Sequence, residues 1–69
     1  GSLVDNAEFS QGAKRLFRES NAFLLTSVQQ EAVDNIIQKL SRIAANPNHD
    51  DNWHDIIGYA TLALKNKDK

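Results

Sequence analysis

The stretch TSVQQEAVDNIIQKLSRIAANP, residues 26–47, decides the fold of this 69-residue chain. Thr26 and Gln29 have the spacing of a capping box, which predicts that a helix begins here. Pro47 requires that helix to end by Asn46, because the residue before a proline is disfavoured in the helical conformation. Between these limits the apolar residues recur at helical spacing as one broad amphipathic stripe: Val28, Ala32, Val33, Ile36, Ile37, Leu40, Ile43 and Ala44.

A first helix is expected ahead of this stretch. Asp5 and Glu8 have capping-box spacing, and Val4 and Phe9 are placed as its hydrophobic staple. This helix should end near residues 19–21, where serine and asparagine favour a turn. Its expected apolar side is made of Phe9, Ala13, Leu16, Phe17 and Phe23.

A third helix is expected after residues 46–50, NPNHD, which are dense in turn-forming residues. Asp50 or Asp51 would cap this helix, and it should run to about Lys65, where cations favour the negative end of the helix dipole. At about 100° per residue, its residues separate onto two sides. One side carries Trp53, Ile56, Ile57, Ala60, Ala63 and Leu64, and the other carries Asp51, Asp55, Gly58 and Leu62.

The fold class expected from this pattern is all-α, since no segment alternates in the manner of a strand. We expect a three-helix domain whose second and third helices form an antiparallel hairpin, with the first helix packed across it. A chain of this size buries only roughly 60% of its unfolded surface, and it has no cysteine for a disulfide or a zinc–thiolate site. We therefore expect a homo-oligomer in which the domain packs as part of a helical bundle.

The composition of the chain ends indicates a domain taken from a longer protein. The sequence contains no methionine, and Gly1-Ser2 is typical of what a protease leaves after removing a tag. We expect residues 1–2 to be this tag scar, residues 3–65 to be one helical domain and residues 66–69 to be a polar tail. The rest of a longer parent chain is then one expected partner.

Charge and hydropathy argue against two classes of partner. A net charge of −1 offers no basic patch for nucleic acid. The turn between the second and third helices is also too long and too acidic for a helix-turn-helix. No apolar run approaches the roughly 18 residues of a membrane span, and no signal peptide is visible. We expect neither nucleic acid nor a membrane as partner.

Carboxylates at helical spacing form two candidate metal sites. Asp51 and Asp55 lie one turn apart and could share a divalent cation, and Gly58 would let a ligand or another backbone approach the same line. The alternative is that both acids favour the start of the helix and Gly58 is a helix–helix contact. Glu31 and Asp34 are a further pair, which could equally be an acidic bias in a first turn.

Two basic residues near the end of the second helix are candidates for phosphate binding. Lys39 and Arg42 lie three apart, and arginine can grip phosphate oxygens with a fork while lysine acts as a point charge. They could equally be solvated residues at the border of the apolar stripe. His49 and His54 have no cysteine or third histidine to complete a zinc site.

The string KLSRIAANPNHDDNWHDIIGYATLALK, residues 39–65, resembles the C-terminal part of small MazG-like proteins of phages and prophages. Their pattern is a K-L-x-R-I helix end, an N-P-x-H turn and then D-x-W-x-D-I-x-G-Y-A. The resemblance continues loosely back to Thr26, and the first 25 residues carry little of it. The matching residues are Lys39, Leu40, Arg42, Ile43, Asn46, Pro47, His49, Asp51, Trp53, Asp55, Ile56, Gly58, Tyr59 and Ala60.

The resemblance implies an all-α fold and a nucleoside triphosphate pyrophosphohydrolase chemistry. Such proteins release pyrophosphate using Mg²⁺ held by helix carboxylates, and they assemble as dimers or tetramers of helical hairpins. By resemblance, Asp55 matches the carboxylate of the third helix, and Lys39 and Arg42 match the basic positions ahead of it. The broader family also has an E-x-x-E pair on an early helix. No E-x-x-E occurs here, and Glu31-x-x-Asp34 is only chemically related to it.

Two functions therefore stand side by side. The first is a MazG-like module that binds dNTP or NTP with Mg²⁺, either as an active pyrophosphohydrolase or as a reduced, non-catalytic version. It would be encoded by a phage or prophage and would act in the cytoplasm of the bacterial host. The alternative is a helical oligomerisation or protein-interaction domain of a larger phage or bacterial protein.

Overall fold

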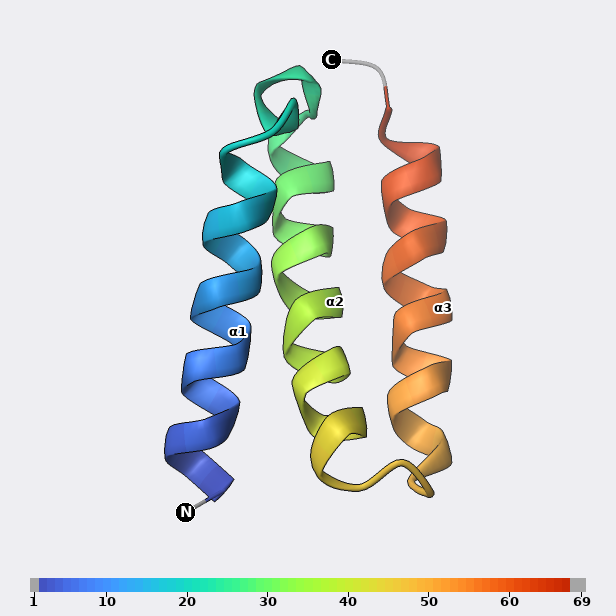
Figure 1. The fold of residues 1–69 in the computed structure, drawn as a ribbon. Helices are drawn as coiled ribbons and strands as arrows, with labels where there is room; N and C mark the ends of the chain where they lie inside the picture. The colour runs from blue at the N-terminus through green and yellow to red at the C-terminus, as the bar shows by residue number, and fades with distance from the viewer. Residues whose placement is uncertain (1, 68–69) are drawn as a thin grey trace.

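The computed structural model describes residues 2–67, which form three long helices joined by short connections (Figure 1). They are α1 (Ser2–Arg18), α2 (Ser27–Ala45) and α3 (Asp50–Lys65), with a short 3₁₀ helix, η1 (Ala22–Leu24), between α1 and α2. These residues contain no strand, which confirms the all-α prediction, and none of these helices is long and apolar enough to cross a membrane. Gly1 of the predicted tag scar and residues 68–69 of the predicted tail lie outside the described residues.

The capping box predicted at the start of α2 is confirmed. Thr26 Oγ1 accepts a hydrogen bond from the Gln29 N–H, and Gln29 Oε1 accepts one from the Thr26 N–H, each at 3.1 Å. Both side chains also donate to the C-terminal end of α3. Thr26 Oγ1 lies 2.9 Å from the Asn66 carbonyl, and Gln29 Nε2 lies 3.1 Å from the Ala63 carbonyl. The capping box therefore fastens the end of α3 to the start of α2.

The cap predicted for α1 is wrong. The helix begins at Ser2, so Asp5 lies inside its first turn rather than at the N-cap. Val4 and Phe9 are both exposed and lie within the helix, so they form no hydrophobic staple. Acidic residues are favoured throughout a first turn by the helix dipole, so the position of Asp5 does not fix the residue at which the helix begins.

The cap predicted for α3 is also wrong. The N-cap residue is His49, which makes no side-chain capping bond, and Asp50 and Asp51 lie in the first turn. Their charges still favour the positive end of the helix dipole there. The predicted ends of the second and third helices are confirmed, since α2 ends at Ala45 and α3 at Lys65.

The helices lie side by side in one layer with α2 in the middle (Figure 1). α2 and α3 form the predicted antiparallel hairpin, whereas α1 lies along the other side of α2 instead of across the hairpin. This arrangement follows from α2, which has small residues on two opposite sides. Ala32 lines a hollow with Tyr59 of α3, and Ser41 lines one with Phe9 of α1.

A single layer encloses little core. The buried apolar residues among those described are Ala22, Ala32 and Ile37, so Ile37 is the only large one. The expected apolar side of α1 is largely open, because Phe9 and Leu16 are exposed while Ser10 is buried. The large apolar side chains that remain exposed are Val4, Phe9, Leu16, Phe23, Leu24, Val28, Leu40, Trp53, Ile57, Leu62 and Leu64.

The stripe of α3 that packs on α2 lies between the two sides that the sequence separates. The buried and half-buried residues form a stripe at helical spacing: Asn52, Ile56, Tyr59, Ala63 and Asn66. Trp53, Ile57 and Leu64, which belong to the predicted apolar side, are 51%, 63% and 68% exposed. The predicted division of α3 into an apolar and a polar side still describes its two open flanks, because the packed stripe runs between them.

Candidate functional site

Two of the candidate residues meet on the polar side of the α2–α3 hairpin. Lys39 Nζ lies 2.7 Å from Asp55 Oδ2, which joins the two helices with an ion pair. The Lys39 side chain is only 15% exposed and that of Asp55 is 47% exposed. In the sequence Lys39 is a candidate for phosphate binding and Asp55 a candidate metal ligand, and in this structure each side chain neutralises the other.

The surrounding cations keep Asp55 ionised. A hydrogen bond from Lys39 and the positive charges of Lys39, Arg42 and His54 hold the pKa of the Asp55 carboxyl below its ordinary value, although partial desolvation opposes them. Arg42, three residues after Lys39, thus acts on the same carboxylate. Asp55 is therefore in the charged form that a cation requires.

Replacing Lys39 with methionine should raise the pKa of the Asp55 carboxyl towards its ordinary value, because the largest cause of the lowered pKa is removed. In the wild type the folded pKa lies below the unfolded one. The pair therefore stabilises the fold above the unfolded pKa and loses this effect as the pH falls through the folded pKa. NMR titration of the Asp55 carboxyl carbon in the wild type and in Lys39→Met measures the two folded-state pKa values to be compared. Lys14→Met is the matched control, and an Asp55 pKa that Lys39→Met leaves unchanged would contradict the assignment.

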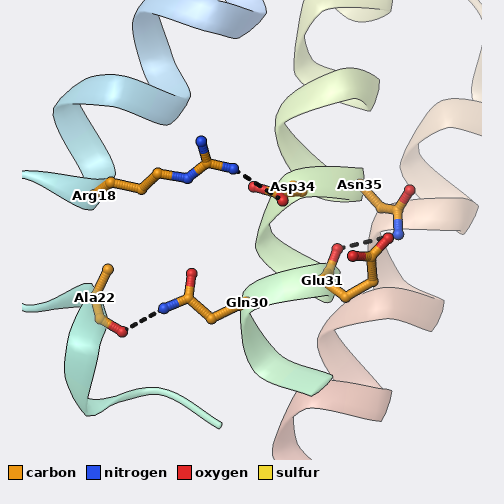
Figure 2. Close-up of polar contacts among 6 residues, drawn as sticks. All are labelled: Arg18, Ala22, Gln30, Glu31, Asp34 and Asn35. Carbon is orange, nitrogen blue, oxygen red and sulfur yellow. Dashed lines mark hydrogen bonds and ion pairs between the residues drawn. The ribbon is translucent and has the colours of Figure 1, made fainter. Parts of the chain in front are cut away.

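The remaining aspartates lie in different surroundings. Asp51 is one turn before Asp55 on α3, and its Oδ2 lies 3.8 Å from His49 Nε2. Asp34 faces α1, where its Oδ2 lies 3.3 Å from Arg18 Nη2 (Figure 2). Within residues 2–67, no group of three or more histidine or acidic side chains is placed to hold a metal ion. Asp51 and Asp55 remain the two candidate carboxylates that helical spacing places on one flank of α3.

Glu31 lines a shallow hollow of about 170 Å³ between α2 and α3. It lies eight residues before Lys39, which is roughly 12 Å along a helix, so it is separate from the ion pair. The hollow is smaller than the roughly 300 Å³ at which ligand pockets begin. Its other lining residues are Val28, Ala32, Asn35, Tyr59 and Leu62.

Asn35 and Tyr59 line this hollow and were not predicted as site residues. Asn35 lies four residues before Lys39, and Tyr59 lies four residues after Asp55. Residues four apart are neighbours on a helix, so both side chains flank the ion pair. The Asn35 Nδ2 donates to the Glu31 carbonyl at 3.1 Å (Figure 2). The spacing from the two candidate residues is the signal that could have found them.

Gly58 has no neighbour in the described chain that requires a glycine. A Cβ atom built on it would meet nothing within 4 Å, so the predicted helix–helix contact is not found there. Glycine nevertheless costs about 1 kcal/mol relative to alanine inside a helix. Gly58 leaves open space on the flank of α3 that carries Asp51 and Asp55.

The fold and the ion pair define a small helical domain with a charged hairpin surface. A family model described as "Domain of unknown function (DUF6378)" matches residues 7–67, which include α2, α3 and most of α1. The chain belongs to this family. No curated protein and no solved structure matches it.

Proposed function

We propose that the chain is a MazG-like nucleotide-binding module of the pyrophosphohydrolase type, which holds dNTP or NTP phosphates on the polar side of the α2–α3 hairpin. One observation carries the proposal: Lys39, Arg42 and Asp55 share one surface, with Lys39 in contact with Asp55. The resemblance of residues 39–65 to MazG-like proteins supports a nucleotide as the ligand.

The chemistry of these residues suits a phosphate–magnesium pair. Lys39 and Arg42 would hold phosphate oxygens by charge-assisted hydrogen bonds. Asp51 and Asp55 fit the one or two carboxylates by which Mg²⁺ is usually held together with substrate phosphates. When bound, the ion would neutralise phosphate charge and activate water. A phosphate that takes Lys39 from Asp55 would free that carboxylate for the cation.

Two neighbouring features suit the same ligand. The open space at Gly58 would let a phosphate chain or a ribose approach the flank that carries the two aspartates. The hollow beside Tyr59 is apolar and would accept part of a base. Since the hollow is small, one chain would enclose a nucleotide only in part. The proposal covers binding and leaves out hydrolysis, because the chain has no E-x-x-E pair.

A panel of dNTPs with Mg²⁺, titrated into ¹⁵N-labelled protein up to millimolar concentration, tests this function. We expect NMR shifts concentrated in residues 39–58. Lys39→Ala or Arg42→Ala should each weaken binding at least about tenfold, since a hydrogen bond to a charged group contributes about 1.5–3 kcal/mol. Lys65→Ala is the control with the same change of charge. Absence of any shift in residues 39–58 would contradict the proposal.

A second candidate function is a helical oligomerisation or protein-interaction domain of a larger phage or bacterial protein. The observation that favours it is the set of exposed large apolar side chains on all three helices, which is unusual for a monomer. In either role we propose a homo-oligomeric part of a longer, phage- or prophage-encoded protein of the bacterial cytoplasm. The two roles are compatible, since Lys39 and Asp55 lie on the side of the layer opposite to Trp53.

A further inference from the structure

One face of the three-helix layer is apolar, and helical geometry identifies it. The ion pairs Arg18–Asp34 and Lys39–Asp55 mark the opposite, polar face. A residue two positions before another points about 200° away from it around the helix. Three apolar residues stand in this relation to a charged residue: Leu16 to Arg18 on α1, Leu40 to Arg42 on α2, and Trp53 to Asp55 on α3.

Further exposed apolar residues lie on the same side of each helix. Phe9 lies two turns before Leu16, Ile57 lies one turn after Trp53, and Leu64 lies two turns after Ile57. We call the resulting set the apolar face; it consists of Phe9, Leu16, Leu40, Trp53, Ile57 and Leu64. These side chains are between 39% and 68% exposed, and none of them is charged. Asp5, one turn before Phe9, is a charged residue at the edge of this face. Exposed apolar side chains gathered on one side of a domain mark an interaction site.

The shape and surface area of the chain show how much surface a partner would have to cover. The Cα atoms span 39 × 26 × 12 Å, so the layer is little thicker than one helix. The accessible surface is 5084 Å² for a chain of 7.7 kDa. A monomer of this mass typically exposes roughly 4,300 Å². The excess of roughly 800 Å² is about what each partner buries in a stable protein–protein interface.

We propose that a second copy of this chain docks on the apolar face, so that two three-helix layers pack face to face. The inference rests on the second candidate function and specifies its surface and its partner. Two packed layers around one core are the usual architecture of a domain, and this chain supplies one layer. The apolar faces of two copies meet without any charge on their six residues, whereas contact between two polar faces would desolvate the Arg18–Asp34 and Lys39–Asp55 ion pairs, which is costly.

A two-fold axis parallel to α2 gives this dimer a specific anchor. An open hollow of about 400 Å³ lies between α1 and α2 and is lined by Asp5, Asn6, Phe9, Ser41, Ala44 and Ala45. The Lys39–Asp55 pair fixes the register of α2 and α3 and sets Trp53 level with Ser41. The axis exchanges the α1 and α3 sides at the same level, so Trp53 of one copy lies over the hollow of the other. Tryptophan is enriched among the residues that dominate interfaces.

The wild-type chain can be tested directly, because Trp53 is its only tryptophan. Sedimentation across a dilution series should show a dimer that dissociates to a monomer. Trp53 emission should shift to longer wavelength over the same concentration range, since the indole is half-exposed in the monomer and covered in the dimer. This measurement requires no variant, so it decides the question even if a substitution prevents folding.

Ile57→Lys should raise the dimer dissociation constant at least about a hundredfold, because the symmetry places two unpaired lysines in the interface. Leu62→Lys is the control, since Leu62 is 51% exposed on the opposite flank of α3 and should leave the dimer intact. A dimer that survives Ile57→Lys, or dissociates without a change in Trp53 emission, overturns this inference and leaves the second candidate function standing. A wild-type chain that stays monomeric at millimolar concentration overturns this inference and the oligomerisation role in the second candidate function.

Discussion

Ile37→Ala should lower the free energy of unfolding by about 2–5 kcal/mol, the range measured for large-to-small changes in protein cores. Ile37 is 6% exposed and is the only large apolar side chain buried among the described residues. A core this small supplies no more than about 3–5 kcal/mol of net stability, so the variant should be largely unfolded. Urea denaturation followed by circular dichroism at low protein concentration measures the effect.

Ile57→Ala removes the same atoms from a different place and is the matched control. Ile57 is 63% exposed, so at concentrations where the chain is monomeric its loss should change stability by no more than about 0.5 kcal/mol. At high concentration the wild type should gain stability by dimerisation, and Ile57→Ala should lose most of that gain. If the two variants were equally destabilised in dilute solution, the assignment of Ile37 as the core residue would be wrong.

The sequence predicts three helices and the limits of α2, because the limits of α2 depend on local chemistry, whereas the caps predicted for α1 and α3 are wrong. The Thr26–Gln29 capping box and Pro47 fix α2 without reference to any other part of the chain. The packed side of each helix depends on its neighbours, so the apolar pattern alone does not identify it. Trp53 and Ile57 lie on the apolar side of α3 and are exposed, whereas Asn52 occupies the packed stripe. A hydrophobic pattern reflects burial in an interface between chains as well as burial in the core of one chain. The exposed apolar side of α3 therefore supports the packing of a second copy on it.

The candidate site was predictable only one helix at a time. The spacing of Lys39 and Arg42 on one helix, and of Asp51 and Asp55 on another, follows from helix geometry alone. Contact between Lys39 and Asp55 depends on the register of α2 against α3, which the turn at residues 46–49 and the packing set together. For the same reason the sequence could not show that Asp34 pairs with Arg18 of α1 and so lies apart from the other aspartates.

Thr26→Ala should destabilise the fold by about 1–3.5 kcal/mol, because this hydroxyl makes hydrogen bonds to two helices. Loss of an N-cap hydroxyl costs about 0.5–2 kcal/mol, and loss of the second hydrogen bond adds roughly 0.5–1.5 kcal/mol. The second bond runs from Thr26 Oγ1 to the Asn66 carbonyl at 2.9 Å, and Thr26 is only 7% exposed. Amide hydrogen exchange should therefore become faster in the first turn of α2 and also in residues 63–66.

The exchange pattern separates a simple cap from a link between the two helices. Thr26→Ser keeps the hydroxyl and should leave both regions close to wild type. Gln29→Ala removes the partner that donates to the Ala63 carbonyl at 3.1 Å. Since the two side chains share one network, the double variant should lose less stability than the sum of the single ones. Faster exchange at the start of α2, with an unchanged exchange rate in residues 63–66, would show that Thr26 only caps its own helix. The hairpin would then be held together by packing of Ile56 and Tyr59.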